Sequence, residues 1–428
     1  MNINLKFSNF ICVIFVIIYS FSALSAQKIS SKKTMGAMVL ANNYFMEKWH
    51  DVGKTIITDS EKPSNIWTRS VYFEGLMALY KVNPDTAYLN YALQWGQFHK
   101  WGLPDGIKTR NANNQCCGQT YIDLYLIDRY KEERIKNIKT CVDSMIVTNK
   151  TDDWNSIDAL QMAMPVFARL GFIYNDKEYY DRMNEMYLLT KLKNGTGGLY
   201  STVDHLWWYD KDFIPPYKEP NGENCFWSRG NGWVVAGLVK TLEFLPEHNK
   251  YRKEYLITLK EMFETLTLLQ RTDGFWNVSL LDPSHFGGKE LTGTALFVYG
   301  MAWGINNGII SQKTYLPVVM KAWNAILEES IHPNGFLGFV QGSGKEPKDG
   351  QPVGYDIVPD FEDFGLGCFL LAGSEVFKLS KSMEPKVKEP KVKEPKVKKT
   401  KAEKESKGSK DAKSHKSGKT GKKSIEQQ

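Results

Sequence analysis

Residues 64–81 read SNIWTRSVYFEGLMALYK. Apolar side chains recur through this stretch mostly at three- and four-residue steps, at Trp67, Val71, Leu76, Leu79 and Tyr80. Because an α-helix has about 3.6 residues per turn, this spacing gathers apolar side chains on one face. The stretch therefore predicts a helix that packs against a core.

The same pattern continues on both sides of this stretch, and most segments end at a Gly or Pro turn. Strand signals are short, at 198–202 and 275–280, and are typical of hairpin arms on loops. Paired helices without a central sheet predict an all-α fold, an (α/α)6 toroid in which six helical hairpins close into a ring. The predicted helices span 34–49, 64–81, 86–101, 116–131, 133–149, 156–170, 177–191, 230–245, 250–270, 291–306, 312–329 and 363–379.

The N-terminus has the pattern of a secretory signal peptide. Lys6 precedes an apolar run from about Phe10 to Leu24, which ends in the small residues Ser25 and Ala26. A membrane anchor is the alternative, but the run is short for a spanning helix and no stop-transfer pattern follows it. We therefore assign residues 1–26 to a cleaved signal, expect a periplasmic or secreted protein, and expect no transmembrane segment after cleavage.

The C-terminus differs in composition from the rest of the chain. Residues 381–428 contain three copies of Glu-Pro-Lys-Val-Lys and hold 17 Lys against 7 acidic residues, a net charge of +10. So little apolar surface predicts a disordered tail, either a solvated extension or a weak tether to acidic surfaces or polyanions. The whole chain carries +7, which leaves −3 for residues 1–380 and argues against a nucleic-acid-binding protein.

About 350 residues remain, 27–380, enough for one large domain or two; we assign them to one hydrolase domain. Five cysteines lie in this range, and an odd number without regular spacing argues against a disulfide scaffold. The seven His are scattered, and the chain has no zinc pattern, phosphate-binding loop or dinucleotide fingerprint. The sequence therefore predicts neither a metal nor a cofactor.

Residues 154–171, WNSIDALQMAMPVFARLG, contain the first candidate for chemistry. Asp158 falls in the first turn of a predicted helix, where a carboxylate often serves only the helix dipole. Met162 lies one turn later on the same face, so the two side chains could line one wall of a site. Pro165 removes a backbone hydrogen bond and is expected to kink this helix.

Residues 226–233, FWSRGNGW, contain the second candidate. The faces of Trp227 and Trp233 could stack on a pyranose ring, and Arg229 could bind a carboxylate through two parallel hydrogen bonds. The glycines permit tight backbone turns near a ligand. The alternative is a helix start with a buried Arg and packed Trp side chains.

These segments resemble the unsaturated glycuronyl hydrolases of glycoside hydrolase family 105. Further blocks of similarity follow in the family's order across roughly 35–380, at 67–80, 118–125, 274–276, 291–297, 361–367 and 370–375. The resemblance implies an (α/α)6 barrel. It also implies removal of a 4,5-unsaturated uronic acid from the non-reducing end of a lyase-generated, rhamnose-containing oligosaccharide, from rhamnogalacturonan or ulvan.

The resemblance also implies roles for single residues. Asp158 falls on the general acid/base, and the positions that line the sugar site fall on Met162, Trp227, Arg229 and Trp233. Where the family often has a His after the Gly-Leu-Tyr turn, the nearest is His205. Amides at positions 113 and 114 stand where members often have an acidic residue, so an assisting second carboxylate is in doubt.

One carboxyl group is chemically sufficient for this reaction. An ordinary glycosidase needs two carboxylates, but the substrate here already contains a vinyl ether between C4 and C5. Protonation of C4 followed by addition of water at C5 gives a hemiketal that opens and releases the leaving sugar. Such an acid benefits from a pKa raised by apolar surroundings, which Trp154 and Met162 could supply.

Three other readings remain open from the sequence. A family 88 type hydrolase would use the same chemistry on glycosaminoglycan fragments, and the Trp-rich block at 227–233 favours family 105 over it. A non-catalytic toroid would bind glycans through the same aromatic side chains. A sugar epimerase would need paired acid/base residues, usually His, and no such pair is apparent.

Overall fold

Helices make up almost all of the regular structure. The structure is a computed structural model that describes residues 30–385, so the predicted signal peptide and residues 386–428 of the predicted tail lie outside the described residues. Each of the twelve predicted helices overlaps an observed one, and the all-α prediction is confirmed. The last helix continues to Met383, three residues into the range assigned to the tail.

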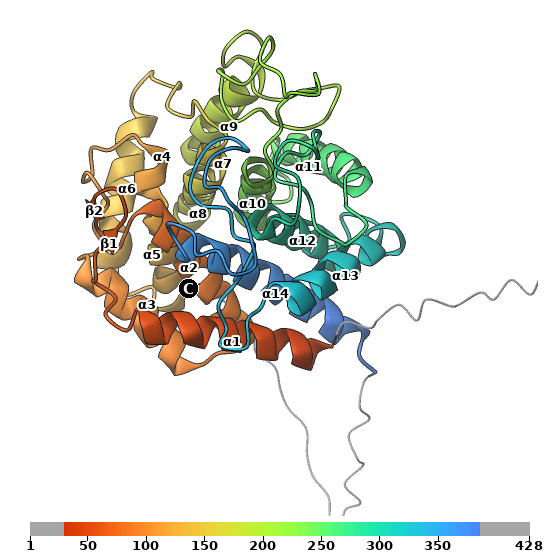
Figure 1. Ribbon diagram of the computed structural model, residues 1–428. Coiled ribbons are helices and arrows are strands. Elements are labelled where there is room, and N and C mark those ends of the chain that lie inside the picture. Colours follow the sequence, from red (N-terminus) through yellow and green to blue (C-terminus); the bar gives the residue numbers. More distant parts are fainter. Residues whose placement is uncertain (1–29, 386–428) are drawn as a thin grey trace, which may run out of the picture. The chain divides into compact units, whose positions relative to one another are not determined.

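Six helical segments pack side by side and close the inner ring (Figure 1). Each contacts the next, and the last, α14, packs against the first, α2. Because neighbours surround these segments, even their polar side chains are largely buried, and in α12 every residue from Leu291 to Ile305 is buried. The inner segments are α2 (Trp67–Val82), α5 (Cys117–Ile127), α7 (Asp158–Met162) with α8 (Met164–Tyr174), α10 (Ser228–Phe244), α12 (Leu291–Asn306) and α14 (Asp363–Met383).

Six further helices form the outer layer and alternate with the inner segments along the chain. They bury one face only; in α6 the buried positions include Ile135, Ile138 and Val142 at three- and four-residue spacing. This alternation confirms the predicted (α/α)6 arrangement. The outer helices are α1 (Ser31–Lys48), α3 (Thr86–Phe98), α6 (Glu133–Ile146), α9 (Lys177–Leu192), α11 (Arg252–Leu268) and α13 (Gln312–Glu329).

Glycines set the close spacing of neighbouring inner helices. A Cβ on Gly293 of α12 would lie 2.2 Å from Ser228 Oγ of α10, and one on Gly367 of α14 would lie 2.3 Å from the Val71 carbonyl of α2. Each contact joins residues within the first turns of both helices, so the inner helices run parallel and begin at the same end of the ring. The loops before them therefore meet at that end.

Two local features qualify the sequence-based predictions. The helix containing Pro165 is broken rather than bent: α7 ends at Met162 and α8 begins at Met164, which places Pro165 in its first turn. The predicted strand signals at 198–202 and 275–280 form only isolated bridges. The two-residue strands β1 (Ile56–Ile57) and β2 (Glu61–Lys62), which were not predicted, pair as a small hairpin.

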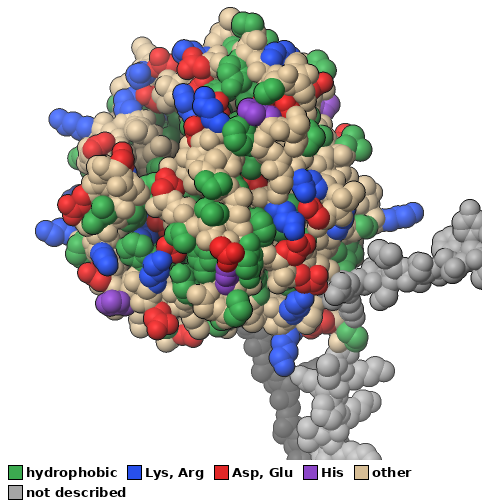
Figure 2. All heavy atoms as spheres, in the orientation of Figure 1, with side chains coloured by type: hydrophobic (Ala, Val, Ile, Leu, Met, Phe, Trp, Pro, Cys, Tyr) green, Lys and Arg blue, Asp and Glu red, His purple; other side chains and the backbone are tan. Residues whose placement is uncertain are grey.

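The described residues up to Glu384 fall in a single compact unit. All five cysteines there are free and buried. On the face shown in Figure 2, basic and acidic side chains are interspersed and no continuous basic area is visible. None of the helices in residues 30–385 combines the length and apolar character needed to cross a membrane.

Candidate active site

Asp158 stands at the end of the ring where the inner helices begin. It is the first residue of α7, and the cap residue Ile157 makes no side-chain capping hydrogen bond. The Asp158 carboxyl group does not cap the helix either: its Oδ2 accepts a hydrogen bond of 2.9 Å from the Tyr209 hydroxyl. Its Oδ1 is buried and has no hydrogen-bond partner. This arrangement argues against the simple capping role that the sequence left open.

The surroundings of Asp158 favour its neutral form. The pKa of this carboxyl is raised to about 6, mainly by burial; the Tyr209 hydrogen bond and the charge of Arg229 lower it, and the nearby Asp210 raises it. Trp154, which the sequence suggested as an apolar neighbour, is fully buried and packs edge-on against Phe167. A carboxyl group that titrates near pH 6 can act as a general acid in its protonated form and then as a base.

Tyr209 is a site residue that the sequence analysis missed. It lies in the loop between α9 and α10, and its carbonyl accepts a hydrogen bond of 3.0 Å from the backbone N–H of Ile157. An antiparallel bridge joins Ser156 to Asp210, so the loop runs directly alongside the start of α7. No periodic pattern marks this loop, and only its run of aromatic residues at 207–209 offered a signal.

Arg229 is fully buried; the two terminal nitrogens of its guanidinium group are engaged, whereas Nε is buried without a hydrogen-bond partner. Its two terminal nitrogens donate hydrogen bonds of 2.6 Å each to the carbonyls of Gln341 and Gly342. The group also lies 4.5 Å from the Trp227 ring and 4.8 Å from the Phe364 ring. Burial lowers the pKa of Arg229, although the carboxylates of Glu290 and Asp158 oppose this. The geometry therefore favours a role in holding the 338–359 loop over the predicted role as a free carboxylate clamp.

The other predicted sugar-site residues are buried beside Asp158 and Arg229. Met162 has no exposed surface, and Trp227 and Trp233 are almost fully buried. The Trp227 indole donates a hydrogen bond of 2.9 Å to Gln341 Oε1, and its ring lies 5.7 Å from that of Tyr209. The glycines of this block serve helix packing, because a Cβ on Gly232 would meet Leu296 and Gly293 of α12. These side chains form the wall of the site, and their contact with a sugar stays a prediction.

His205 is placed apart from this group. Its ring stacks on that of Tyr200, whose hydroxyl donates a hydrogen bond of 2.5 Å to Glu261 of α11. Thr265, also on α11, donates to the carbonyl of the preceding residue, Asp204. This end of the loop therefore faces an outer helix, and no contact in the described residues joins His205 to Asp158. The predicted binding role of His205 stays a prediction without geometric support.

The amides of Asn113 and Asn114, which replace the expected carboxylates, lie just before α5. The short helix α4 (Ala112–Gln115) contains them, and the Asn114 side chain donates hydrogen bonds of 2.8 Å to Asp105 and 3.0 Å to Thr109. Asp210 is the acidic group whose charge acts on Asp158, but its Oδ1 accepts the backbone N–H of Asp212 at 2.8 Å. Asp158 is therefore the carboxyl group best suited to proton transfer in this part of the structure.

An open groove lies beside the site and has room for a sugar. It has a volume of about 720 Å³ and lies between the β1–β2 hairpin, the start of α2 and the 343–361 loop. Trp67 is half-buried in its wall, stands edge-on to Trp233 at 6.3 Å and leans on Phe364 at 5.4 Å. Trp67 thus contacts both the groove and the aromatic residues around Arg229. No binding role was predicted for it from the sequence.

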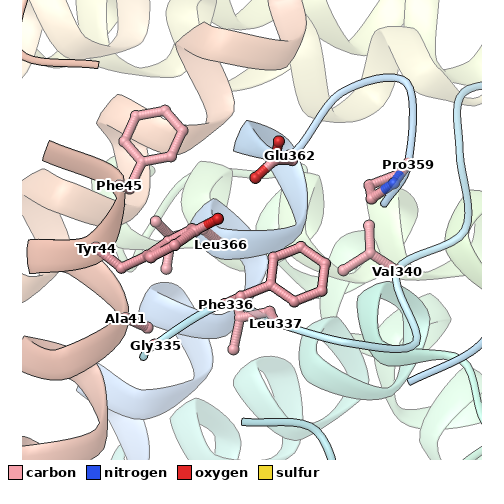
Figure 3. A pocket seen from close by; sticks show the side chains of 10 residues that line it. All are labelled: Ala41, Tyr44, Phe45, Gly335, Phe336, Leu337, Val340, Pro359, Glu362 and Leu366. Carbon is pink, nitrogen blue, oxygen red and sulfur yellow. The ribbon is translucent and has the colours of Figure 1, made fainter. Parts of the chain in front are cut away.

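A second, apolar pocket lies between α1 and the segment before α14 (Figure 3). Side chains such as Phe45, Phe336 and Leu366 surround it, and its volume is about 20 Å³. A cavity of this size holds about one water molecule. It is therefore too small for a sugar and is not a candidate active site.

Comparison with known proteins identifies the family. A family model described as Glycosyl Hydrolase Family 88 matches residues 37–380. The chain belongs to this family. It is therefore a glycoside hydrolase, as the sequence predicted. The family 88 enzyme also shares its fold with a possible member of family 105 from Salmonella enterica, at 21% identity and a TM-score of 0.65 over 82% of this chain and 95% of that one.

Three other known proteins are considerably more similar to this chain than the Salmonella enterica protein is. The unsaturated 3S-rhamnoglycuronyl hydrolase of Formosa agariphila is 31% identical over 334 residues, which cover 74% of this chain and 85% of that protein. A family 88 glycosyl hydrolase from Bacteroides vulgatus is 29% identical, with a TM-score of 0.73 over 82% and 99% of the two chains. The polysaccharide lyase BACCELL_00875 is 30% identical, with a TM-score of 0.74 over 83% and 100%.

Proposed function

We propose that this glycoside hydrolase removes a 4,5-unsaturated uronic acid from the non-reducing end of a rhamnose-containing oligosaccharide. The observation that carries the proposal is the carboxyl group of Asp158, whose pKa is raised to about 6 and whose Oδ1 is buried without a hydrogen-bond partner. The name of the Formosa agariphila relative, a rhamnoglycuronyl hydrolase, supports rhamnose as the leaving sugar. Rhamnogalacturonan and ulvan are the two sources that we expect.

The proposed reaction has two proton transfers. Protonated Asp158 donates its proton to C4, and the vinyl ether becomes an oxocarbenium ion at C5. The Asp158 carboxylate then takes a proton from a water molecule while the oxygen of that water adds to C5. The hemiketal opens, and the rearranged sugar releases the leaving group without direct attack at the anomeric carbon. Asp158 ends protonated, ready for the next substrate.

The surroundings suit an anionic substrate. The N-termini of α7, α10, α12 and α14 meet at this end of the ring, where helix dipoles place partial positive charge, although Glu290 caps the first N–H groups of α12. The buried charge of Arg229 adds to this field although its donors face the 338–359 loop. In this proposal the unsaturated uronate lies against Asp158, and the leaving sugar extends into the groove beside Trp67.

We expect the enzyme to remove the ultraviolet absorbance of the conjugated C4–C5 double bond from lyase-generated disaccharides. Purified protein would be incubated with unsaturated rhamnogalacturonan, ulvan and glycosaminoglycan disaccharides while this absorbance is recorded. A loss with a rhamnose-containing substrate is the expected result. A loss only with glycosaminoglycan fragments would favour the family 88 type specificity, and no change with any of them would contradict the proposal.

The same measurement tests a second candidate function. The similarity to the polysaccharide lyase BACCELL_00875 favours a lyase, which would create the C4–C5 double bond rather than consume it. A lyase would raise the absorbance of saturated, uronate-containing oligosaccharides and leave unsaturated disaccharides unchanged. The hydrolase would therefore lower the absorbance of the C4–C5 double bond, whereas the lyase would raise it.

The raised pKa of Asp158 predicts a definite pH dependence. The first step needs the protonated acid, so kcat/KM should be level below pH 6 and fall about tenfold per pH unit above it, since the pKa in the free enzyme is about 6. An Asp of ordinary pKa would place the same fall about two units lower. Measurement of kcat/KM on an unsaturated disaccharide from pH 4 to 9 checks this, and a rate that rises through pH 6 would contradict it.

A further inference from the structure

We propose that Tyr209 is a positioning residue that reserves one oxygen of Asp158, Oδ1, for proton transfer. The inference rests on the proposed function and concerns how the acid is kept ready. Tyr209 occupies Oδ2 through its hydrogen bond of 2.9 Å, whereas Oδ1 is buried without a partner. The two oxygens of the acid are therefore not equivalent.

The loop fixes the phenol in place over Asp158. The hydrogen bond from Ile157 N–H to the Tyr209 carbonyl and the bridge between Ser156 and Asp210 hold its backbone against the residues before α7. The ring itself lies edge-on to Trp227 at 5.7 Å and to Phe213 at 6.1 Å. These contacts involve the ring and the backbone, so they do not depend on the hydroxyl group.

The direction of the hydrogen bond decides where the proton of the neutral acid sits. Burial and the negative charge of Asp158 raise the pKa of the Tyr209 phenol, so the phenol stays protonated and acts as the donor. While the phenol donates to Oδ2, as it does in the structure, Oδ2 is an acceptor and the carboxyl proton of the neutral acid lies on Oδ1. Without Tyr209, either oxygen could hold the proton, and the acid could turn the wrong one toward C4.

The hydrogen bond also helps in the second half of the reaction. When the Oδ1–H bond breaks and the new C4–H bond forms, Asp158 becomes a carboxylate and the hydrogen bond from Tyr209 becomes charge-assisted and stronger. Water then forms the C5–O bond and returns one proton to Oδ1. Tyr209 keeps its own proton throughout and exchanges no atom with the substrate.

Two other charged groups near Asp158 also change the pKa of its carboxyl group. Asp210 raises the pKa of Asp158, and Arg229 lowers it. Neither is a hydrogen-bond partner of the Asp158 side chain, so neither can distinguish its two oxygens.

The test replaces Tyr209 by Phe, which keeps the ring contacts and removes the hydroxyl. We expect kcat to fall about 10- to 100-fold with little change in KM. The fall of kcat/KM at high pH should move to higher pH, because the hydrogen bond that favours the carboxylate is lost. Tyr217→Phe is the matched control. Tyr217 lies in the same loop as Tyr209, but its hydroxyl donates to Glu346 at 3.1 Å, so the rate and pH profile of this variant should not change.

A second measurement does not depend on turnover. Titration of the Asp158 carboxyl carbon by NMR, assigned with Asp158→Asn, should give a higher pKa in Tyr209→Phe than in the wild type. An unchanged pKa together with an unchanged kcat would overturn the positioning role. Failure of the wild type to act on any unsaturated disaccharide would instead refute the proposed function, and the NMR titration would still decide whether Tyr209 controls Asp158.

Discussion

Asp158→Asn should lower kcat by about 10³-fold on an unsaturated disaccharide, because the amide can neither donate the proton to C4 nor accept one from water. The loss should appear at every pH, unlike the loss that the wild type shows above pH 6. Single-turnover rates measured with an excess of enzyme over substrate would quantify the residual activity. The substrate should still bind, so its affinity for the variant should stay within a few-fold of the wild-type KM.

The same variant separates catalysis from helix stability. If Asp158 served mainly as a first-turn charge, its replacement would lower the stability by about 0.3–1 kcal/mol. Here the folded state disfavours the ionised carboxyl, whose pKa is raised, so the neutral amide should keep or increase the melting temperature at pH 7.5. A variant that unfolds earlier but retains most of its activity would show that the capping role was the correct one.

Arg229→Ala should cause the largest loss of stability among the site variants. The change leaves the carbonyls of Gln341 and Gly342 without their donors and removes the cation between the Trp227 and Phe364 rings. Unsatisfied buried groups of this kind cost about 1–3 kcal/mol each, so we expect a loss of about 3 kcal/mol or more. Urea unfolding would measure it, and limited proteolysis should cut the variant earlier within residues 338–359.

Two further variants serve as controls for Arg229→Ala. Arg229→Lys keeps the charge but cannot reach both carbonyls with a planar fork, so it should recover only part of the stability. Arg129→Ala, on an exposed side chain, should change the free energy of unfolding by no more than about 0.5 kcal/mol. If Arg229→Ala instead keeps full stability and only raises KM, then Arg229 is the carboxylate clamp that the sequence predicted.

The fold was largely predictable because its signal is local. A segment such as 64–81 carries its helical period within a few turns, and the inner and outer helices alternate along the chain. The break before Pro165 also followed from a local rule, since proline cannot supply the backbone N–H that an unbroken helix needs. The β1–β2 hairpin was missed because two-residue strands have no detectable period.

The site was predictable only in part. Asp158 could be selected because a family resemblance pointed to it, and the structure then added its burial and its orphan Oδ1. The partners of Arg229 lie more than 110 residues away in sequence, so nothing near position 229 indicates that its two terminal nitrogens are hydrogen-bonded. Tyr209 likewise meets Asp158 across 51 residues through an irregular loop, and chain proximity to the Gly-Leu-Tyr turn favoured His205 instead.

The central claim is that the sugar leaves because the double bond is hydrated. Real-time proton NMR of an unsaturated, rhamnose-containing disaccharide tests it most directly, since the vinyl proton at C4 and the anomeric proton of the released sugar are followed together. We expect the vinyl signal to disappear at least as fast as free sugar appears, and neither change to occur with Asp158→Asn. Release of free sugar while the vinyl signal persists would mean attack at the anomeric carbon and would rule out hydration of the double bond as the cause.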